Sequence, residues 1–277
     1  MPHSSAVESH HFAALGTSCS LFAAGRSRAD LLEGESWVRR LGARLTRFSA
    51  DSELSQLNAA GGRWFAIGEE LEALLCESLR AFEMSAGLVN VAVLPSMLAI
   101  GYTRPLTEGA TVATLEGARP LTALPDVLSV RRGAARVASG SALDLGGIAK
   151  GWMADRLCEA LGPSALANLG GDLGAVGAGP EGSGWPVAVA GTTLMLRGQG
   201  AATSSVRCRR WGEVHHLIDA RTGLPARTGL EEVSVVAAGG FEAEVVAKTA
   251  LLVGPELAPA YCAAHALAWS LGVAHDG

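Results

Sequence analysis

Residues 143–155 read Leu-Asp-Leu-Gly-Gly-Ile-Ala-Lys-Gly-Trp-Met-Ala-Asp, and this stretch decides how the chain is organised. Its pattern predicts the end of a strand, a glycine turn and the first turns of a helix. Glycine pairs occur where a turn needs positive φ or where backbone approaches a ligand closely. A helix N-terminus also offers unpaired N–H groups to an anion. The stretch fits either an anion-binding turn or an ordinary strand-to-helix connection, so the rest of the chain must decide.

Helices are predicted on both sides of this stretch. Residues 29–45 carry apolar side chains at helical spacing, and residues 69–84 form the clearest amphipathic helix, with Gly87 just past its end. Asp51 or Ser52 is expected to cap a short helix between these two. Further helices are expected around 109–118, from 148 to 161, over Phe241–Val253 and over 256–264.

Short strands separated by glycine turns account for most of the remaining chain. Residues 11–23 suit a strand that is broken at Gly16-Thr17, and residues 88–106 read as irregular. No fixed repeat and no long linker interrupts residues 1–277. The prediction is therefore an α+β fold, a single compact domain of mixed sheets with packed helices, in which residues 1–10 are flexible. The other expected strands are Trp64–Ile67, Val127–Val130, Ala135–Val137, Ala165–Asn168, Leu173–Val176, Pro186–Ala190, Thr193–Leu196, Ala201–Ser204, Val214–Ile218, Glu232–Ala237 and 266–270.

Composition excludes several classes of function. The net charge is -5, and no basic run interleaved with aromatic residues occurs, so we expect no nucleic-acid binding. No apolar run is long enough to span a membrane. The five cysteines form no C-x-x-C pair, which argues against zinc and disulfide frameworks and favours a reducing compartment. No signal peptide is visible at the N-terminus, and a cytoplasmic protein is expected.

Only two of the 22 Lys and Arg residues are lysines, Lys150 and Lys248. A chain that uses arginine almost everywhere draws attention to its few lysines, because an ammonium and a guanidinium differ in chemistry. Lys248 follows Glu244 by four residues on an expected helix. Spacing alone explains that pair as a favourable helix ion pair worth about 0.2–0.5 kcal/mol.

The common nucleotide-binding and hydrolase motifs are either absent or lack the structural context that they require. A G-x-G-x-x-G run occurs at 177–182, but Ser-Gly-Trp-Pro follows it and cannot open a helix, so we interpret it as a surface loop. No P-loop, G-x-S-x-G or H-E-x-x-H motif is present. His215 and His216 are adjacent on an expected strand, whose alternation sends only one imidazole into any single site.

Taken together, several segments resemble the ApbE family of flavin transferases, which move FMN from FAD to a Thr or Ser of a target protein and release AMP. Each segment is weak alone, and their order and spacing carry the resemblance. It runs through most of the chain. The matching segments are Gly16-Thr17, Arg47-Phe48-Ser49-Ala50-Asp51-Ser52-Glu53-Leu54-Ser55, Asn58, Asp144-Leu-Gly-Gly-Ile-Ala-Lys150-Gly with Asp155, Asn168-Leu-Gly-Gly-Asp172, Ala202-Thr203-Ser204 and His216-Leu-Ile-Asp219-Ala-Arg-Thr-Gly223.

The resemblance implies a role for each matching residue. His216 is expected to activate the acceptor hydroxyl as a general base, and Lys248 is expected to take part in catalysis. The implied Mg²⁺ site comprises the carbonyl of Gly147 with Glu244 and Lys248. Partners are FAD and an acceptor protein that carries a Thr or Ser. The implied FAD-binding residues are Leu15, Gly16, Phe48, Asn58, Val89, Asn90, Asp144, Lys150, Gly170, Asp172, Thr203 and Ile218.

Two of the four departures from the family pattern fall at the implied metal site. Glu244 and Lys248 stand where the family has a metal-binding Asp and Thr, Asn90 replaces an Asp, and Ser205 replaces a Gly. A charged lysine places an ammonium about where the cation should sit. Three readings therefore stay open. The first is a flavin transferase in which Lys248 replaces part of the cation's charge. The second is an FAD pyrophosphatase or biosynthetic flavin enzyme, and the third is a non-catalytic flavin binder.

Overall fold

A seven-stranded antiparallel sheet runs through the molecule in the order β1-β2-β6-β7-β10-β15-β16. The computed structural model describes residues 6–109, 112, 115 and 118–273. The chain leaves this sheet after β2 and returns at β6, and residues 25–164 form the intervening helices and a small sheet. The strands of the large sheet are β1 (Val7–Ala14), β2 (Thr17–Ala24), β6 (Ala165–Leu169), β7 (Asp172–Val176), β10 (Gly200–Ser205), β15 (Leu230–Ala237) and β16 (Ala268–Val273).

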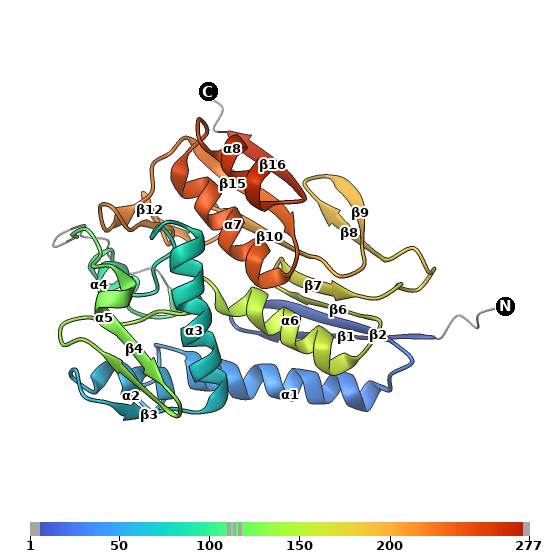
Figure 1. Ribbon diagram of the computed structural model, residues 1–277, viewed down its shortest axis with the longest axis horizontal. Helices are drawn as coiled ribbons and strands as arrows, with labels where there is room; N and C mark the ends of the chain where they lie inside the picture. The colour runs from blue at the N-terminus through green and yellow to red at the C-terminus, as the bar shows by residue number, and fades with distance from the viewer. Residues whose placement is uncertain (1–5, 110–111, 113–114, 116–117, 274–277) are drawn as a thin grey trace.

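Helices cover one face of the large sheet (Figure 1). Helix α1 (Arg28–Leu45) packs on β1 and β2, α6 (Ala149–Leu161) on β6 and β7, and α7 (Gly240–Val253) on β10 and β15. Alternate residues of each strand meet these helices, as period-2 geometry requires. The residues between them pack against a hairpin of β8 (Trp185–Val189) and β9 (Thr192–Leu196).

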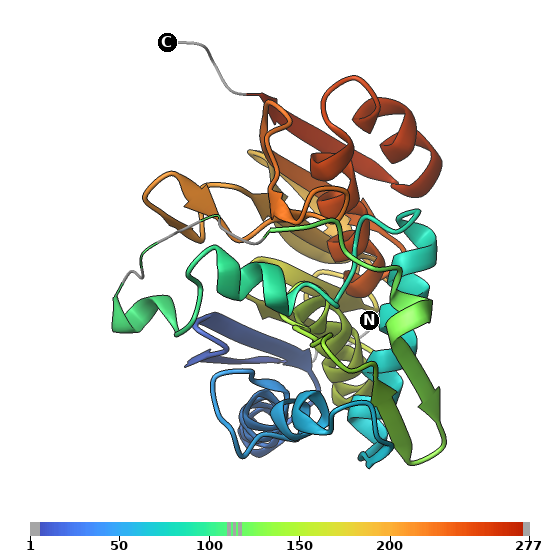
Figure 2. The same ribbon diagram turned by 90° about the vertical axis from the view of Figure 1, so that its left-hand side faces the viewer.

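The intervening segment builds a second group of elements beside the helical layer (Figure 2). Its central helix is α3 (Glu69–Met84), which contacts α7. A three-stranded sheet in the order β3-β5-β4 lies nearby. The other elements of this segment are α2 (Glu53–Ala59), β3 (Phe65–Ala66), α4 (Leu94–Ala99), η1 (Leu106–Glu108), α5 (Leu124–Val127), β4 (Leu128–Arg131) and β5 (Ala134–Val137). Later in the chain come β11 (Arg210–Trp211), β12 (Val214–His215), β13 (Ile218–Asp219), β14 (Leu224–Pro225) and α8 (Ala258–His265).

The long amphipathic segments were predicted correctly. In α1 the predicted stripe of Leu31, Val38, Leu41 and Leu45 is buried, and Ser52 caps α2 by accepting a hydrogen bond from the N–H of Ser55 at 3.0 Å. These features depend on contacts a few residues apart, which sequence patterns report directly. The α+β class is confirmed.

Three expectations at segment level need correction. Residues 1–10 were expected to be flexible; residues 1–5 lie outside the described residues, whereas β1 begins at Val7 and pairs with β2, with His10 buried. A single strand over 214–218 is in fact two short strands, β12 and β13, in two separate hairpins. The strand expected over Trp64–Ile67 is reduced to Phe65–Ala66. Residues 110–111, 113–114 and 116–117 of the helix expected around 109–118 lie outside the described residues.

Helices α6 and α7 approach each other closely at their N-terminal ends. A Cβ atom added at Gly151 would lie 2.3 Å from the carbonyl oxygen of Gly240, so glycine is needed for this approach. The two helices also cap each other. Asp155 of α6 accepts hydrogen bonds from the N–H groups of Gly240 (2.7 Å) and Phe241 (2.9 Å), and Glu244 of α7 accepts one from Gly151 (2.9 Å). Each carboxylate satisfies N-terminal donors of the other helix, which fixes their relative position.

Candidate functional site

The glycine turn that precedes α6 is held by hydrogen bonds from two distant segments. The side chain of Asn58 accepts from the N–H of Leu143 at 2.8 Å and donates to its carbonyl at 2.9 Å. The N–H of Asp144 donates to the carbonyl of Val91 at 2.8 Å. The carboxylate of Asp144 then accepts from the N–H of Gly146 at 2.8 Å. Asn58 therefore orients the turn, which is a physical reason for its place among the predicted site residues.

Replacing Asn58 with alanine is expected to destabilise the fold by about 1–3 kcal/mol, because both polar groups of Leu143 lose their partner. Thermal unfolding should show a melting temperature lower by roughly 2–4 °C for each kcal/mol. The matched control is Gln56→Ala on the same helix, whose exposed side chain bonds only the carbonyl of Asp51. An Asn58→Ala protein as stable as Gln56→Ala would contradict this role.

Both lysines of the chain converge on one buried carboxylate. Glu244 is 3% exposed, and its Oε1 lies 3.7 Å from the Nζ atoms of both Lys150 and Lys248. Lys150 also forms an ion pair with Asp172, and Lys248 donates a hydrogen bond to the carbonyl oxygen of Gly147. The structure thus brings together four charged side chains that were predicted, those of Lys150, Lys248, Glu244 and Asp172, and the carbonyl of Gly147.

Burial and mutual attraction set the protonation of this cluster. Burial is the main cause that lowers the pKa of Lys150 to about 8. Burial likewise lowers the pKa of Lys248 from its ordinary value. Burial alone would raise the pKa of Glu244, but the charges of Lys150 and Lys248 outweigh it and the net shift is downwards. Glu244 is therefore ionised at neutral pH and lies between the side chains of Lys150 and Lys248.

The residues at the implied Mg²⁺ position do not fit a magnesium ion. The ammonium of Lys248 contacts Gly147 and lies beside Glu244, so a cation already occupies the position between these oxygens. An ammonium has no lone pair to donate to a metal while it is charged. The second oxygen of Glu244 is bonded to the N–H of Gly151. Within the described ranges, no group of three or more His, Cys, Asp and Glu side chains could hold a metal.

The two adjacent histidines have different surroundings. The Nε2 atom of His215 donates to the carbonyl of Ala226 at 2.9 Å and its Nδ1 accepts from Leu217 at 3.2 Å, so its role is structural. His216 has a buried Nδ1 with no hydrogen-bond partner among the described residues. Burial first, and then the nearby charges of Arg209 and Lys248, hold the pKa of His216 well below 6.5. Its imidazole is neutral at neutral pH and free to accept a proton.

An aromatic wall lies next to the glycine turn. Arg47 forms an ion pair with Asp144 at 2.7 Å, and its guanidinium carbon lies 4.2 Å from the ring centre of Phe48 and 4.5 Å from that of Tyr102. Trp211 continues the wall, 5.1 Å from Tyr102. Phe48 is 40% exposed, so an apolar ring face is available to a planar ligand.

No role was predicted for Arg47, Tyr102 or Trp211. Arg47 is the more informative of these, since its buried Nη2 has no hydrogen-bond partner in the part of the chain that the structure describes. A buried donor without a partner costs about 1–3 kcal/mol. The sequence did offer a signal for Arg47, because this residue precedes Phe48 in the segment 47–55 that matches the family. The two unpartnered buried nitrogens, on Arg47 and His216, suit a site that is completed by a polar ligand.

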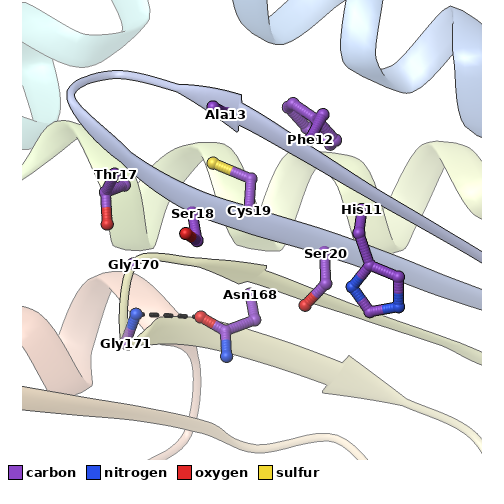
Figure 3. Close-up of a pocket in the computed structure, with 10 residues that line it drawn as sticks. All are labelled: His11, Phe12, Ala13, Thr17, Ser18, Cys19, Ser20, Asn168, Gly170 and Gly171. Atoms are coloured by element: carbon purple, nitrogen blue, oxygen red, sulfur yellow. Dashed lines mark hydrogen bonds between the residues drawn. The ribbon is translucent and has the colours of Figure 1, made fainter.

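The β1–β2 hairpin and the β6–β7 turn line a pocket (Figure 3). Leu15 and Gly16 make the hairpin turn with φ values of 55° and 69°, and Leu15 packs toward Gly42 of α1. Gly170 also has positive φ, and a Cβ there would lie 2.4 Å from Oγ1 of Thr17. A pocket of about 670 Å³ opens between these turns. Asp172, the partner of Lys150, follows this second turn directly.

The structure does not place every predicted FAD-binding residue at the charged cluster. Val89 is in the main core, and the buried Asn90 side chain bonds the carbonyl of Thr122 and the N–H of Ala92, both at 2.9 Å. Thr203 is the one exposed residue of β10, and its hydroxyl is hydrogen-bonded to that of Ser234 at 2.9 Å. Ile218 packs with Tyr102 and Trp211 behind the aromatic wall. The contacts that the structure shows for these four are packing and internal hydrogen bonds, and their assignment to FAD binding stays a prediction.

Comparison with known proteins supports a common fold. A sequence model described as "ApbE family" matches residues 15–269. The FAD:protein FMN transferase of Treponema pallidum (strain Nichols) is 30% identical over 247 residues, which cover 74% of this chain and 66% of that protein. The chain thus spans just under two thirds of this relative's length.

Two solved structures share the architecture. The apo form of the flavinyl transferase ApbE of Pseudomonas stutzeri gives a TM-score of 0.81 at 24% identity and covers 98% of this chain and 93% of that chain. The flavin transferase ApbE of Vibrio cholerae gives a TM-score of 0.80 at 21% identity, covering 98% and 95%. Among the described residues, no helix has both the length and the apolar character to cross a membrane.

Proposed function

This chain belongs to the ApbE family, and from that premise we propose that it transfers FMN from FAD to a Thr or Ser hydroxyl of an acceptor protein and releases AMP. The observation that carries this proposal is the convergence of Lys150 and Lys248 on buried Glu244. Both lysines are close enough to the neutral His216 for their charges to lower its pKa. Beside these cations, Phe48 offers an exposed ring. Two ammonium groups next to an aromatic face suit a molecule that joins a pyrophosphate to a planar ring system.

The chemistry assigns one task to each part of the site. His216 takes the proton of the acceptor hydroxyl as that oxygen forms a bond to the phosphorus of the FMN half. The bond between this phosphorus and the bridging oxygen breaks, and the electron pair leaves with AMP. Negative charge develops on the transferred and departing phosphates, where the ammonium groups of Lys150 and Lys248 stabilise it. Placement of the three reacting groups in line is the remaining requirement.

We assign to Lys248 the charge that a magnesium ion would supply. Its ammonium already bridges Gly147 and Glu244, the oxygens that the family pattern implies as metal ligands. Burial lowers the pKa of Lys248, and the carboxylate of Glu244 opposes this effect by favouring the charged ammonium. Transfer would then proceed without a divalent cation.

Incubation of the protein with FAD tests the proposal. The products are analysed by chromatography for AMP and by mass spectrometry for synthetic peptides that each carry one Thr or Ser. Transfer is expected to add the mass of FMN less one water to a peptide and to release an equal amount of AMP. AMP and free FMN without a modified peptide would favour the pyrophosphatase reading. Bound, intact FAD would favour a non-catalytic flavin binder.

FAD affinity is expected to fall as the pH rises through about 8, because Lys150 loses its charge around that pKa. The contribution of Lys150 to the free energy of unfolding changes in the opposite direction with pH. An unfolded lysine titrates near 10.4, so the unfolded chain binds more protons between about 8 and 10.4 and this contribution rises with pH in that window. Flavin fluorescence titrations across this range, alongside thermal unfolding, measure both. A Lys150→Arg protein should bind FAD without the fall near pH 8, and an unchanged wild-type affinity across pH 8 would contradict the assignment.

Two further proposals concern the protein as a whole. A cytoplasmic location is supported by the five free cysteines at residues 19, 76, 158, 208 and 262, of which three are buried. Cell fractionation tests it.

A single domain over residues 1–277 is supported by the continuous sheet from β1 to β16. A single cooperative unfolding transition is the expected result.

A further inference from the structure

The β11–β12 hairpin places Arg209 opposite His216. Arg210 and His215 are paired across this hairpin, and the N–H of His216 donates to the carbonyl of Arg209 at 3.1 Å. Residues directly opposite each other in an antiparallel pair project their side chains to the same face. Arg209, which is half-buried, therefore enters the site from the same side as His216.

The charge of Arg209 acts on the groups of the cluster. After burial, it is the largest cause that lowers the pKa of His216. It also opposes protonation of Lys150 and Lys248, behind the effects of burial and of Glu244 on their pKa values. Arg209 therefore lies within electrostatic range of all three groups, which come from different elements.

Arg209 differs from its neighbours in having no partner for its charge. Arg207 pairs with Glu231, and Arg210 lies 3.7 Å from Glu213. Over residues 6–109, 112, 115 and 118–273, no carboxylate forms an ion pair with Arg209. The two lysines of the cluster share Asp172 and Glu244 between them. Arg209 is thus the cation of the site whose charge is not balanced.

We propose that Arg209 binds the pyrophosphate of FAD and supplies a second positive charge beside that of Lys248. This inference rests on the proposed function. A divalent ion would bring two charges, whereas one ammonium brings a single charge that it shares with Glu244. As the bond to AMP breaks, the departing phosphate gains one negative charge and the acceptor proton moves to His216. The planar guanidinium of Arg209 offers paired N–H donors to two phosphate oxygens.

Arg209→Gln is expected to weaken FAD binding by about 10–100-fold, the usual effect of losing charge-assisted hydrogen bonds. Affinity for riboflavin, which lacks the phosphates, should stay unchanged, and Arg209→Lys should recover part of the FAD affinity. FAD binding by the Gln variant should also depend less steeply on salt than wild-type binding does. The matched control is Arg210→Gln, which removes the adjacent, exposed cation and is expected to bind both flavins as the wild type does.

Three results would overturn the inference. Arg209→Gln could bind FAD as tightly as Arg210→Gln, which removes any role in phosphate binding. It could lose FAD and riboflavin alike, which indicates a structural defect of the hairpin. Wild-type protein that neither binds FAD nor releases AMP would defeat the proposed function together with this inference. Wild-type protein that binds FAD while Arg209→Gln is unaltered defeats the inference alone. Melting temperatures of all variants verify that each one folds.

Discussion

Replacing Lys248 with threonine is expected to lower metal-free AMP release from FAD by about 10²–10³-fold, the usual loss when one preorganised electrostatic group is removed. The ammonium is bound between Gly147 and Glu244, and threonine leaves that position without a cation. The three groups left there are a carbonyl, a carboxylate and a hydroxyl, which are the hard oxygen donors that Mg²⁺ prefers. Added Mg²⁺ should therefore restore part of the activity of Lys248→Thr while leaving the wild type unaffected. The measurement is initial AMP release in chelator and in Mg²⁺.

The control for this variant removes a cation outside the site. Arg156→Gln is suitable, because Arg156 lies on α6, is about half exposed and pairs only with Glu159 among the described residues. It should release AMP at the wild-type rate in chelator. If Lys248→Thr keeps full metal-free activity, the ammonium has no part in the reaction. If the wild type itself requires Mg²⁺, Lys248 does not replace the metal.

His216→Asn is expected to reduce FMN transfer by about 10²–10⁴-fold, the range for loss of a general base. FAD affinity should change little, because the imidazole is neutral and serves the acceptor hydroxyl. Asparagine keeps a polar group of similar size in the buried position but cannot take up the proton. Single-turnover transfer to peptide, measured beside FAD titrations, separates the two effects.

The adjacent histidine provides a matched comparison. His215→Asn loses the hydrogen bond to Ala226, so its melting temperature should fall while transfer per folded molecule is retained. Added imidazole should partly restore transfer in a His216→Gly variant, since a free base can enter the vacated volume. Equal loss of transfer in the His215 and His216 variants would show that the hairpin matters only for folding.

The sequence predicted most of the fold because its main features are local. The buried stripe of α1 and the Ser52 cap of α2 depend on residues three to seven positions apart, and both are present as predicted. The charged cluster was predicted through the family resemblance, which assigned Lys150 to FAD binding and Glu244 and Lys248 to the implied metal site. The structure brings these residues into contact.

Other features depend on contacts that no local pattern reports. Glu244 bonds Gly151, 93 residues away, and Asp155 bonds Gly240, 85 residues away, so their capping roles appear only when α6 and α7 cross. The start of β1 at Val7 follows from pairing with β2, which outweighs the weak local signal of a polar N-terminus. The position of Arg209 was inferred only from the hairpin register that sets it opposite His216. For the same reason, Asn90 and Val89 could not be assigned to internal contacts beforehand.

The most direct test of the account is AMP release from FAD by the wild-type protein after complete removal of divalent metal. The protein is treated with chelator and incubated with FAD and Thr- or Ser-containing peptides, with and without added Mg²⁺. The cluster of Lys150, Lys248 and Glu244 predicts AMP release and peptide flavinylation at the same rate in both samples. AMP release that occurs only after Mg²⁺ is added would contradict the assignment of Lys248 as the cation of the site.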